Sequence, residues 1–123
     1  MLKILVADNY NIHRIGLVQI LIDAFPGAAV DEVIDVDALL NKAVTQKWDV
    51  IIYGFILPVE KGIDMVQKIK ETDPATPLAV CGMQIQQEDI TRFLDAGASA
   101  FVDKGAKASS IVQQVNKILS AKK

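Results

Sequence analysis

The sequence predicts a single α/β domain over residues 1–123, built on a doubly wound parallel sheet. Short apolar runs alternate five times along the chain with longer segments of helical period. The short runs lack regular polar–apolar alternation, which is typical of parallel strands covered by helices on both faces. With 123 residues, 51% of them hydrophobic, the chain can enclose an ordinary core.

Five strands are expected from the short apolar runs. The run 50–55 is the clearest candidate for a central strand and belongs to the longest apolar run of the chain, 50–57. A weaker strand precedes it in the chain, because Asp31 and Glu32 interrupt its apolar residues. The complete set of predicted strands is 4–7, 28–33, 50–55, 78–81 and 100–102.

Five helices are expected between and after these strands. In the first, Ile15, Val18, Ile22 and Phe25 recur at spacings of three and four, which predicts that they face the core. Helical stripes are also expected from Leu39, Leu40, Ala43 and Val44, and from Ile90, Phe93 and Leu94. The predicted helices cover 12–25, 36–45, 62–71, 87–96 and a final segment that contains the apolar residues of 111–119.

The strand order follows from the connections. Right-handed crossovers and five strands favour the flavodoxin-like order 2-1-3-4-5. In that order the crevice that binds ligands lies at the carboxyl ends of the first, third and fourth strands. Candidate functional residues should therefore follow Ala7, Phe55 and Cys81, and the end of the fifth strand.

Composition excludes several classes of function. A formal net charge of -2 provides no basic field for a phosphate backbone, so we expect no nucleic-acid binding by this domain. One cysteine and one histidine allow no intramolecular disulfide and give little basis for a zinc site. The longest apolar run and the opening residues predict neither a membrane span nor a signal peptide. A cytoplasmic location is the expectation.

Three segments carry a family resemblance. They are Ala7-Asp8-Asn9-Tyr10 followed by Arg14-Ile15-Gly16-Leu17, then Pro58 with Gly62, and then the run from Asp95 to Lys104. In order and spacing they resemble the receiver domains of bacterial response regulators. More narrowly, they resemble receivers at the front of transcription factors with a helix-turn-helix output. The resemblance covers essentially the whole chain and implies a role in two-component signalling.

In an active receiver, an acidic pair after the first strand holds Mg²⁺ together with a phospho-accepting aspartate that ends the third strand. A Ser or Thr ends the fourth strand, and a Lys follows the fifth. The nucleophile must be a carboxylate. The cation neutralises the phosphoryl group, while the hydroxyl and the ammonium bind it once it is attached.

The sequence departs from this pattern at most of these positions. Asp8 matches the first acid and Lys104 matches the lysine. Asn9 replaces the second acid, Gly54 replaces the accepting aspartate, and Gly82 replaces the hydroxyl residue. The resemblance therefore implies a degenerate phosphorylation pocket with no catalytic residue. We expect the Mg²⁺ site to be lost or weak, with Asp8 as the residual candidate ligand.

Other residues near the pocket receive structural interpretations. Phe101 falls at the family's aromatic switch position and, with no hydroxyl at Gly82, is expected to stay in one rotamer. Tyr53 and Cys81 are expected to be core side chains, and His13 is expected to be solvated. Asp8 and Lys104 are expected to form an ion pair across the crevice.

The leading hypothesis is a pseudo-receiver that is not an enzyme and acts in transcription control through protein contacts. Expected partners are a second copy of the chain, through the first helix or the face formed by 87–121, and a DNA-binding output domain after Lys123. One alternative is a phosphorylatable receiver with an atypical acceptor. Another is a small-ligand sensor that uses a cavity between Asp8, Gly54, Gly82 and Lys104.

Overall fold

The computed structural model describes residues 1–55 and 58–121 and contains a five-stranded parallel sheet in the order β2-β1-β3-β4-β5. This order confirms the predicted one. The strands are β1 (Lys3–Ala7), β2 (Ala29–Val33), β3 (Val50–Gly54), β4 (Leu78–Gly82) and β5 (Ala100–Asp103). The helices are α1 (Asn11–Ala24), α2 (Val36–Thr45), α3 (Val59–Thr72), α4 (Gln87–Asp95) and α5 (Ala108–Ala121).

Most predicted boundaries lie within one residue of the observed ones. The third helix differs more, because α3 begins at Val59, three residues before the predicted start. Pro58 is its N-cap residue and has an extended backbone, with φ -84° and ψ 155°. Helix α2 has a clearer start, since the side chain of Asp35 accepts a 2.8 Å hydrogen bond from the amide of Ala38.

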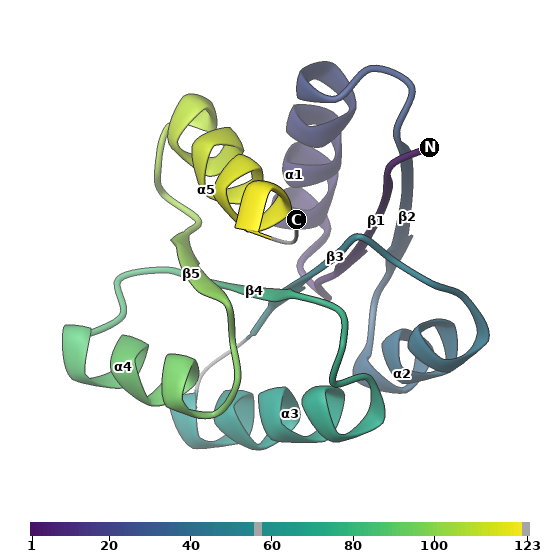
Figure 1. Ribbon diagram of the computed structural model, residues 1–123. Helices are drawn as coiled ribbons and strands as arrows, with labels where there is room; N and C mark the ends of the chain where they lie inside the picture. The colour runs from purple at the N-terminus through teal and green to yellow at the C-terminus, as the bar shows by residue number, and fades with distance from the viewer. Residues whose placement is uncertain (56–57, 122–123) are drawn as a thin grey trace.

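The helices form two layers around the sheet. Helices α1 and α5 cover one face, and α2, α3 and α4 cover the other (Figure 1). Successive strand residues point to opposite faces, so Ile52 packs with α1 and α5 whereas Tyr53 packs on the opposite side. Every residue of β3 and β4 is buried. This double coverage explains why these strands show no polar alternation in the sequence.

The predicted inward face of α1 was right at Val18 and Phe25 and wrong at Ile15 and Ile22. Ile15 and Ile22 are 61% and 48% exposed, and the buried residues are Val18 and Leu21. Helix α1 is apolar on its outer side as well, so residue spacing alone could not identify the buried side. The buried faces predicted for α2 and α4 were each wrong at one residue, since Val44 is 64% exposed and Leu94 is 41% exposed.

Parallel register brings the predicted crevice residues to one edge of the sheet. Ala7 pairs with Tyr53, Gly54 with Cys81, and Gly82 with Asp103. The residues that follow these strand ends therefore meet in space although they lie far apart in the chain. Among the described helices, none has the length and apolar character needed to cross a membrane.

Candidate functional site

Asp8 and Lys104 form a buried ion pair at the carboxyl ends of the strands. Asp8 follows β1 and Lys104 follows β5, and Asp8 Oδ2 lies 2.8 Å from Lys104 Nζ. Their side chains are only 1% and 8% exposed, respectively. The expected pair is therefore present. Its burial means that water screens the two charges far less than in a surface salt bridge.

The two oxygens of the Asp8 carboxylate differ in their partners. Oδ1 accepts a 2.9 Å hydrogen bond from the amide of Tyr10. Oδ2 receives no hydrogen bond of good geometry from the described residues, although it faces the ammonium of Lys104. The charge of Lys104 is thus the main compensation for this buried oxygen.

The ammonium of Lys104 has two further neighbours on the α1 side. Nζ lies 3.3 Å from Nδ1 of His13 and 5.6 Å from the centre of the Tyr10 ring. The rings of Tyr10 and His13 contact each other edge to face, with centroids 5.3 Å apart. His13 is half-buried over the ion pair, so the expectation that it is simply solvated was wrong.

Gly54 leaves no free space at the position of the family's phospho-accepting aspartate. A Cβ atom built there would collide with Oδ2 of Asp8 and lie 2.7 Å from Asp8 Cγ and 3.1 Å from Lys104 Nζ. Real Cβ atoms do not approach other heavy atoms this closely. The ion pair therefore occupies the volume that a side chain at position 54 would enter.

Gly82 is enclosed by apolar side chains. A Cβ atom there would lie 2.8 Å from Cζ of Phe101 and 3.0 Å from Cγ1 of Ile85, and it would also collide with the ring of Phe55. Phe55, Phe93 and Phe101 form one aromatic cluster, with centroid distances of 4.7 to 6.3 Å. Phe101 thus points toward the space that a hydroxyl-bearing side chain at position 82 would fill.

These contacts change the outline of one site that the sequence suggested. A ligand cavity between Asp8, Gly54, Gly82 and Lys104 was a hypothesis because two glycines lie there. The ion pair fills the space beside Gly54, and the aromatic cluster fills the space beside Gly82. Gly54 and Asp8 still line a cleft on the side of α2 and α3, but Gly82 and Lys104 are not part of its lining.

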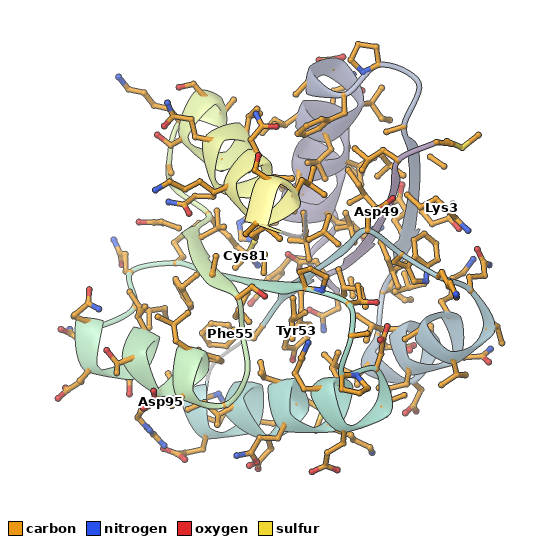
Figure 2. The ribbon with its side chains drawn as sticks, in the orientation of Figure 1. Lys3, Asp49, Tyr53, Phe55, Cys81 and Asp95 are labelled. Carbon is orange, nitrogen blue, oxygen red and sulfur yellow. The ribbon has the colours of Figure 1, made fainter. Side chains whose placement is uncertain are left out.

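Two titratable core residues flank the site on opposite faces of the sheet. Figure 2 shows Tyr53 on the side of α3 and Cys81 on the side of α5. Burial raises the pKa of Tyr53 to about 12, and the nearby Asp8 carboxylate adds to the effect. Burial also raises the pKa of the Cys81 thiol to about 12, against an opposing influence of Lys104. Both groups are therefore protonated at neutral pH.

The residues present do not fit the Mg²⁺ site that the family resemblance implies. Mg²⁺ requires several oxygen ligands, of which carboxylates are the strongest. Asp8 is held by Lys104, Asn9 is exposed on the following turn, and Gly54 offers no side chain. Within residues 1–55 and 58–121, no group of three or more His, Cys, Asp and Glu side chains could hold a metal ion.

The fold and the strand-end site define a class of protein. A doubly wound sheet of order 2-1-3-4-5, with an aspartate after β1 and a lysine after β5 in contact, has the arrangement of a receiver domain. The family model for the response regulator receiver domain matches residues 4–116. The chain belongs to this family.

Individual relatives agree with this assignment. The chain is 27% identical to the response regulator GacA of Pseudomonas syringae and 24% identical to a glycerol metabolism activator of Pseudomonas putida. These alignments cover 100% and 98% of this chain but 58% and 55% of the relatives, so the chain spans little more than half their length.

Solved structures show the same fold. The structure of a LuxR family DNA-binding response regulator from Silicibacter pomeroyi superposes with a TM-score of 0.84 at 27% identity and covers 98% of this chain and 93% of that chain. A CheY-like receiver from Methanospirillum hungatei gives a TM-score of 0.85 at 20% identity, with coverages of 99% and 96%.

Sequence reasoning found the residues of the pocket but missed those that fill it. Tyr10 and His13 cover the lysine, and Phe55 and Ile85 occupy the space beside Gly82. The only sequence signal for Phe55 was its place directly after Gly54, where a bulky side chain follows a residue that has none. Nothing in the spacing of Ile85 points to this contact.

Proposed function

We propose that this chain is a pseudo-receiver, which does not accept phosphate and acts in two-component signalling and transcription control through protein contacts. The observation that carries the proposal is the buried Asp8–Lys104 ion pair, which occupies the volume beside Gly54. An acyl phosphate needs a carboxylate at that point, and glycine supplies none. We also propose that the domain holds no resident Mg²⁺ and has no enzymatic activity.

The ion pair of Lys104 with Asp8 also supports the proposal that the domain does not accept phosphate. In the receiver pattern the ammonium binds the attached phosphoryl group, which must reach it across the crevice. Here Lys104 already contacts a carboxylate of the chain itself, 2.8 Å away, in a site that is closed to solvent. A phosphoryl group would have to displace that buried contact without a metal cluster to compensate its own charge.

The decisive test is the intact mass of the protein after incubation with phosphoramidate and Mg²⁺. We expect no added phosphoryl group, while an ordinary receiver treated in parallel gains one. A stoichiometric adduct would refute the proposal. Asp8→Asn, treated in the same way, would then show whether Asp8 is the acceptor, because only an adduct on Asp8 disappears in that variant.

We further propose that α1 is the surface through which two copies of the chain associate. Ile12, Ile15 and Ile22 are 86%, 61% and 48% exposed on its outer side. Exposed apolar residues gathered on one element mark an interaction surface more often than residues scattered singly. The other expected face, over α4, β5 and α5, offers less, because Leu94 is its only large exposed hydrophobic residue among those described.

Two features of α1 favour a second copy as the partner. Between Ile12 and Ile22 the outer side carries the uncharged Gln19, whose side-chain amide donates a 2.9 Å hydrogen bond to Asp23, so the carboxylate at the end of this surface is partly compensated. Gly16 has no atom within 4 Å of the position of a Cβ, which leaves room for a helix to approach closely. The one arginine of the helix, Arg14, is held by Glu32 and by the carbonyl of Asp8.

Sedimentation equilibrium tests this association. We expect a concentration-dependent dimer that Ile15→Glu disrupts, because the two-fold axis would place two carboxylates near each other. Val44→Glu is the matched control, since Val44 is equally exposed, at 64%, but lies on α2. A chain that stays monomeric at millimolar concentration, or a dimer that only Val44→Glu disrupts, would contradict the assignment to α1.

The link to transcription control rests on relatives. The Silicibacter pomeroyi protein is a DNA-binding response regulator by name. We propose that the output partner of this domain is likewise a DNA-binding domain, while the domain itself, with its net charge of -2, does not contact DNA. The cytoplasmic location stays a prediction from the sequence.

A further inference from the structure

A cleft of about 460 Å³ lies over the carboxyl ends of β1 and β3, between the turn that starts α2 and the first half of α3. It is separate from a smaller hollow of about 190 Å³ on the α1 side, and Asp8 borders both. Pockets for small molecules typically measure roughly 300–1,000 Å³. The larger cleft is therefore of a suitable size. It shares Asp8 and Gly54, but not Gly82 and Lys104, with the cavity that the sequence suggested.

The hydroxyl of Tyr53 distinguishes this cleft from a surface irregularity. Tyr53 lines the cleft and is only 8% exposed, with its ring packed in the core on the side of α3 (Figure 2). No hydrogen bond among the described residues involves its hydroxyl. Asp8 Oδ2 is the one buried side-chain polar atom without a hydrogen bond among the described residues, so the Tyr53 hydroxyl reaches the cleft and is open to water or to a ligand there.

The protonation state of Tyr53 sets the chemistry of that partner. With a pKa of about 12 the phenol stays neutral, and the Asp8 carboxylate disfavours its ionisation further. The hydroxyl is therefore available to donate a hydrogen bond at neutral pH. Its complement on a ligand is an acceptor such as a carbonyl oxygen.

The remaining lining favours an uncharged, flat and apolar body. Ile34, Val36, Pro58 and Met65 provide apolar walls. Of the two carboxylates, Asp8 is paired with Lys104 and Asp35 caps α2, so neither is free to bind a cation. An anion would face both of these carboxylates and find one ammonium in the lining, the exposed Lys61.

We infer that this cleft is a binding site for a neutral small molecule with an aromatic or similarly flat body and a carbonyl oxygen that accepts a hydrogen bond from Tyr53. The site would make the domain responsive to a small ligand. The cleft includes the family's acceptor position, since Gly54 lines it together with Asp8 and Asn9. The inference therefore rests on the proposed loss of phosphorylation, which the intact-mass test probes separately from ligand binding.

Three neutral aromatic carbonyl compounds, coumarin, acetophenone and benzamide, serve as probes, with benzoate as the charged counterpart of benzamide. Each is titrated into ¹⁵N-labelled protein at millimolar concentration, and amide shifts are followed by NMR. We expect at least one neutral probe to shift the amides of 34–36 and 59–65, and benzamide to bind more tightly than benzoate. Absence of binding by all three neutral probes, or shifts centred on α1 and α5, would overturn the inference.

Two tyrosine variants make the test specific. Tyr53→Phe keeps the ring and removes only the hydroxyl, so the melting temperature should not fall. Affinity for the probe should fall roughly 2- to 12-fold, as for the loss of one hydrogen bond. Tyr10→Phe is the matched control, because Tyr10 is 49% exposed and lies outside the cleft lining, and its affinity should not change. Equal binding by Tyr53→Phe and the unmodified protein would contradict the assigned role of the hydroxyl.

Discussion

Removal of the lysine of the buried ion pair should destabilise the fold by an amount that a surface salt bridge could not produce. The variant Lys104→Met keeps most of the apolar stem of the side chain and removes its ammonium group. Asp8 then stays buried, with a side chain 1% exposed, and its Oδ2 loses the cation that it contacts. The hydrogen bond from the Tyr10 amide to Oδ1 remains.

The expected loss follows from this geometry. Breaking a buried ion pair from one side costs about 3–5 kcal/mol, whereas exposed pairs contribute about 0–1 kcal/mol. We expect a value near the lower end, roughly 3 kcal/mol, because one carboxylate oxygen keeps its backbone partner.

Urea denaturation at pH 7 measures this loss. The matched variants are Asp8→Asn and the double variant Asp8→Asn/Lys104→Met. The double variant should be more stable than Lys104→Met alone, because a neutral amide replaces the uncompensated carboxylate. A loss below about 1 kcal/mol in Lys104→Met, or a double variant no more stable than Lys104→Met, would show that the pair behaves as a solvated one and would refute the reasoning.

Three further predictions address the surroundings of the pair. Gly82→Thr should cost about 1–3 kcal/mol in urea denaturation, because its Cβ would lie 2.8 Å from Phe101, and Phe101→Leu in the same background should recover part of that loss. Cys81, 2% exposed, should not react with a thiol reagent in the folded protein at pH 8 but should react fully in urea. Stability should fall as pH rises from 9 toward 12, because Cys81 and Tyr53 lose their protons near pH 9 and 10 when unfolded but near 12 when folded. Denaturation at pH 8 and 10.5 checks this slope, and Tyr53→Phe should flatten it.

The sequence was sufficient to predict the strands and their order, but not the orientation of every helix. Strands β3 and β4 are buried on both faces. A continuous apolar run that alternates with helical segments therefore indicates a buried parallel strand. Helix α1 could not be oriented, because Ile12 and Ile15 on its outer side are as apolar as Val18 on its inner side. Periodicity identifies a buried face only when the other face is polar.

The candidate site was predictable in its positions and not in its packing. Parallel topology brings the residues after β1 and β5 together, so Asp8 and Lys104 could be paired from the sequence. Whether Gly54 and Gly82 leave empty space depends on which neighbours turn inward, and spacing carries no information on that. The unpaired hydroxyl of Tyr53 was equally hidden, because a core tyrosine and a pocket tyrosine occupy the same place in a strand.

The position of the Asp8–Lys104 pair along the chain also bears on how this domain folds. The two residues are 104 − 8 = 96 positions apart, and β3 and β4 lie between their strands in the sheet. The acid after the first strand is therefore compensated only when the fifth strand has been added to the sheet. Any partly folded chain that lacks this last strand encloses a carboxylate with no cation, so such intermediates are penalised and the domain should form and unravel as one cooperative unit.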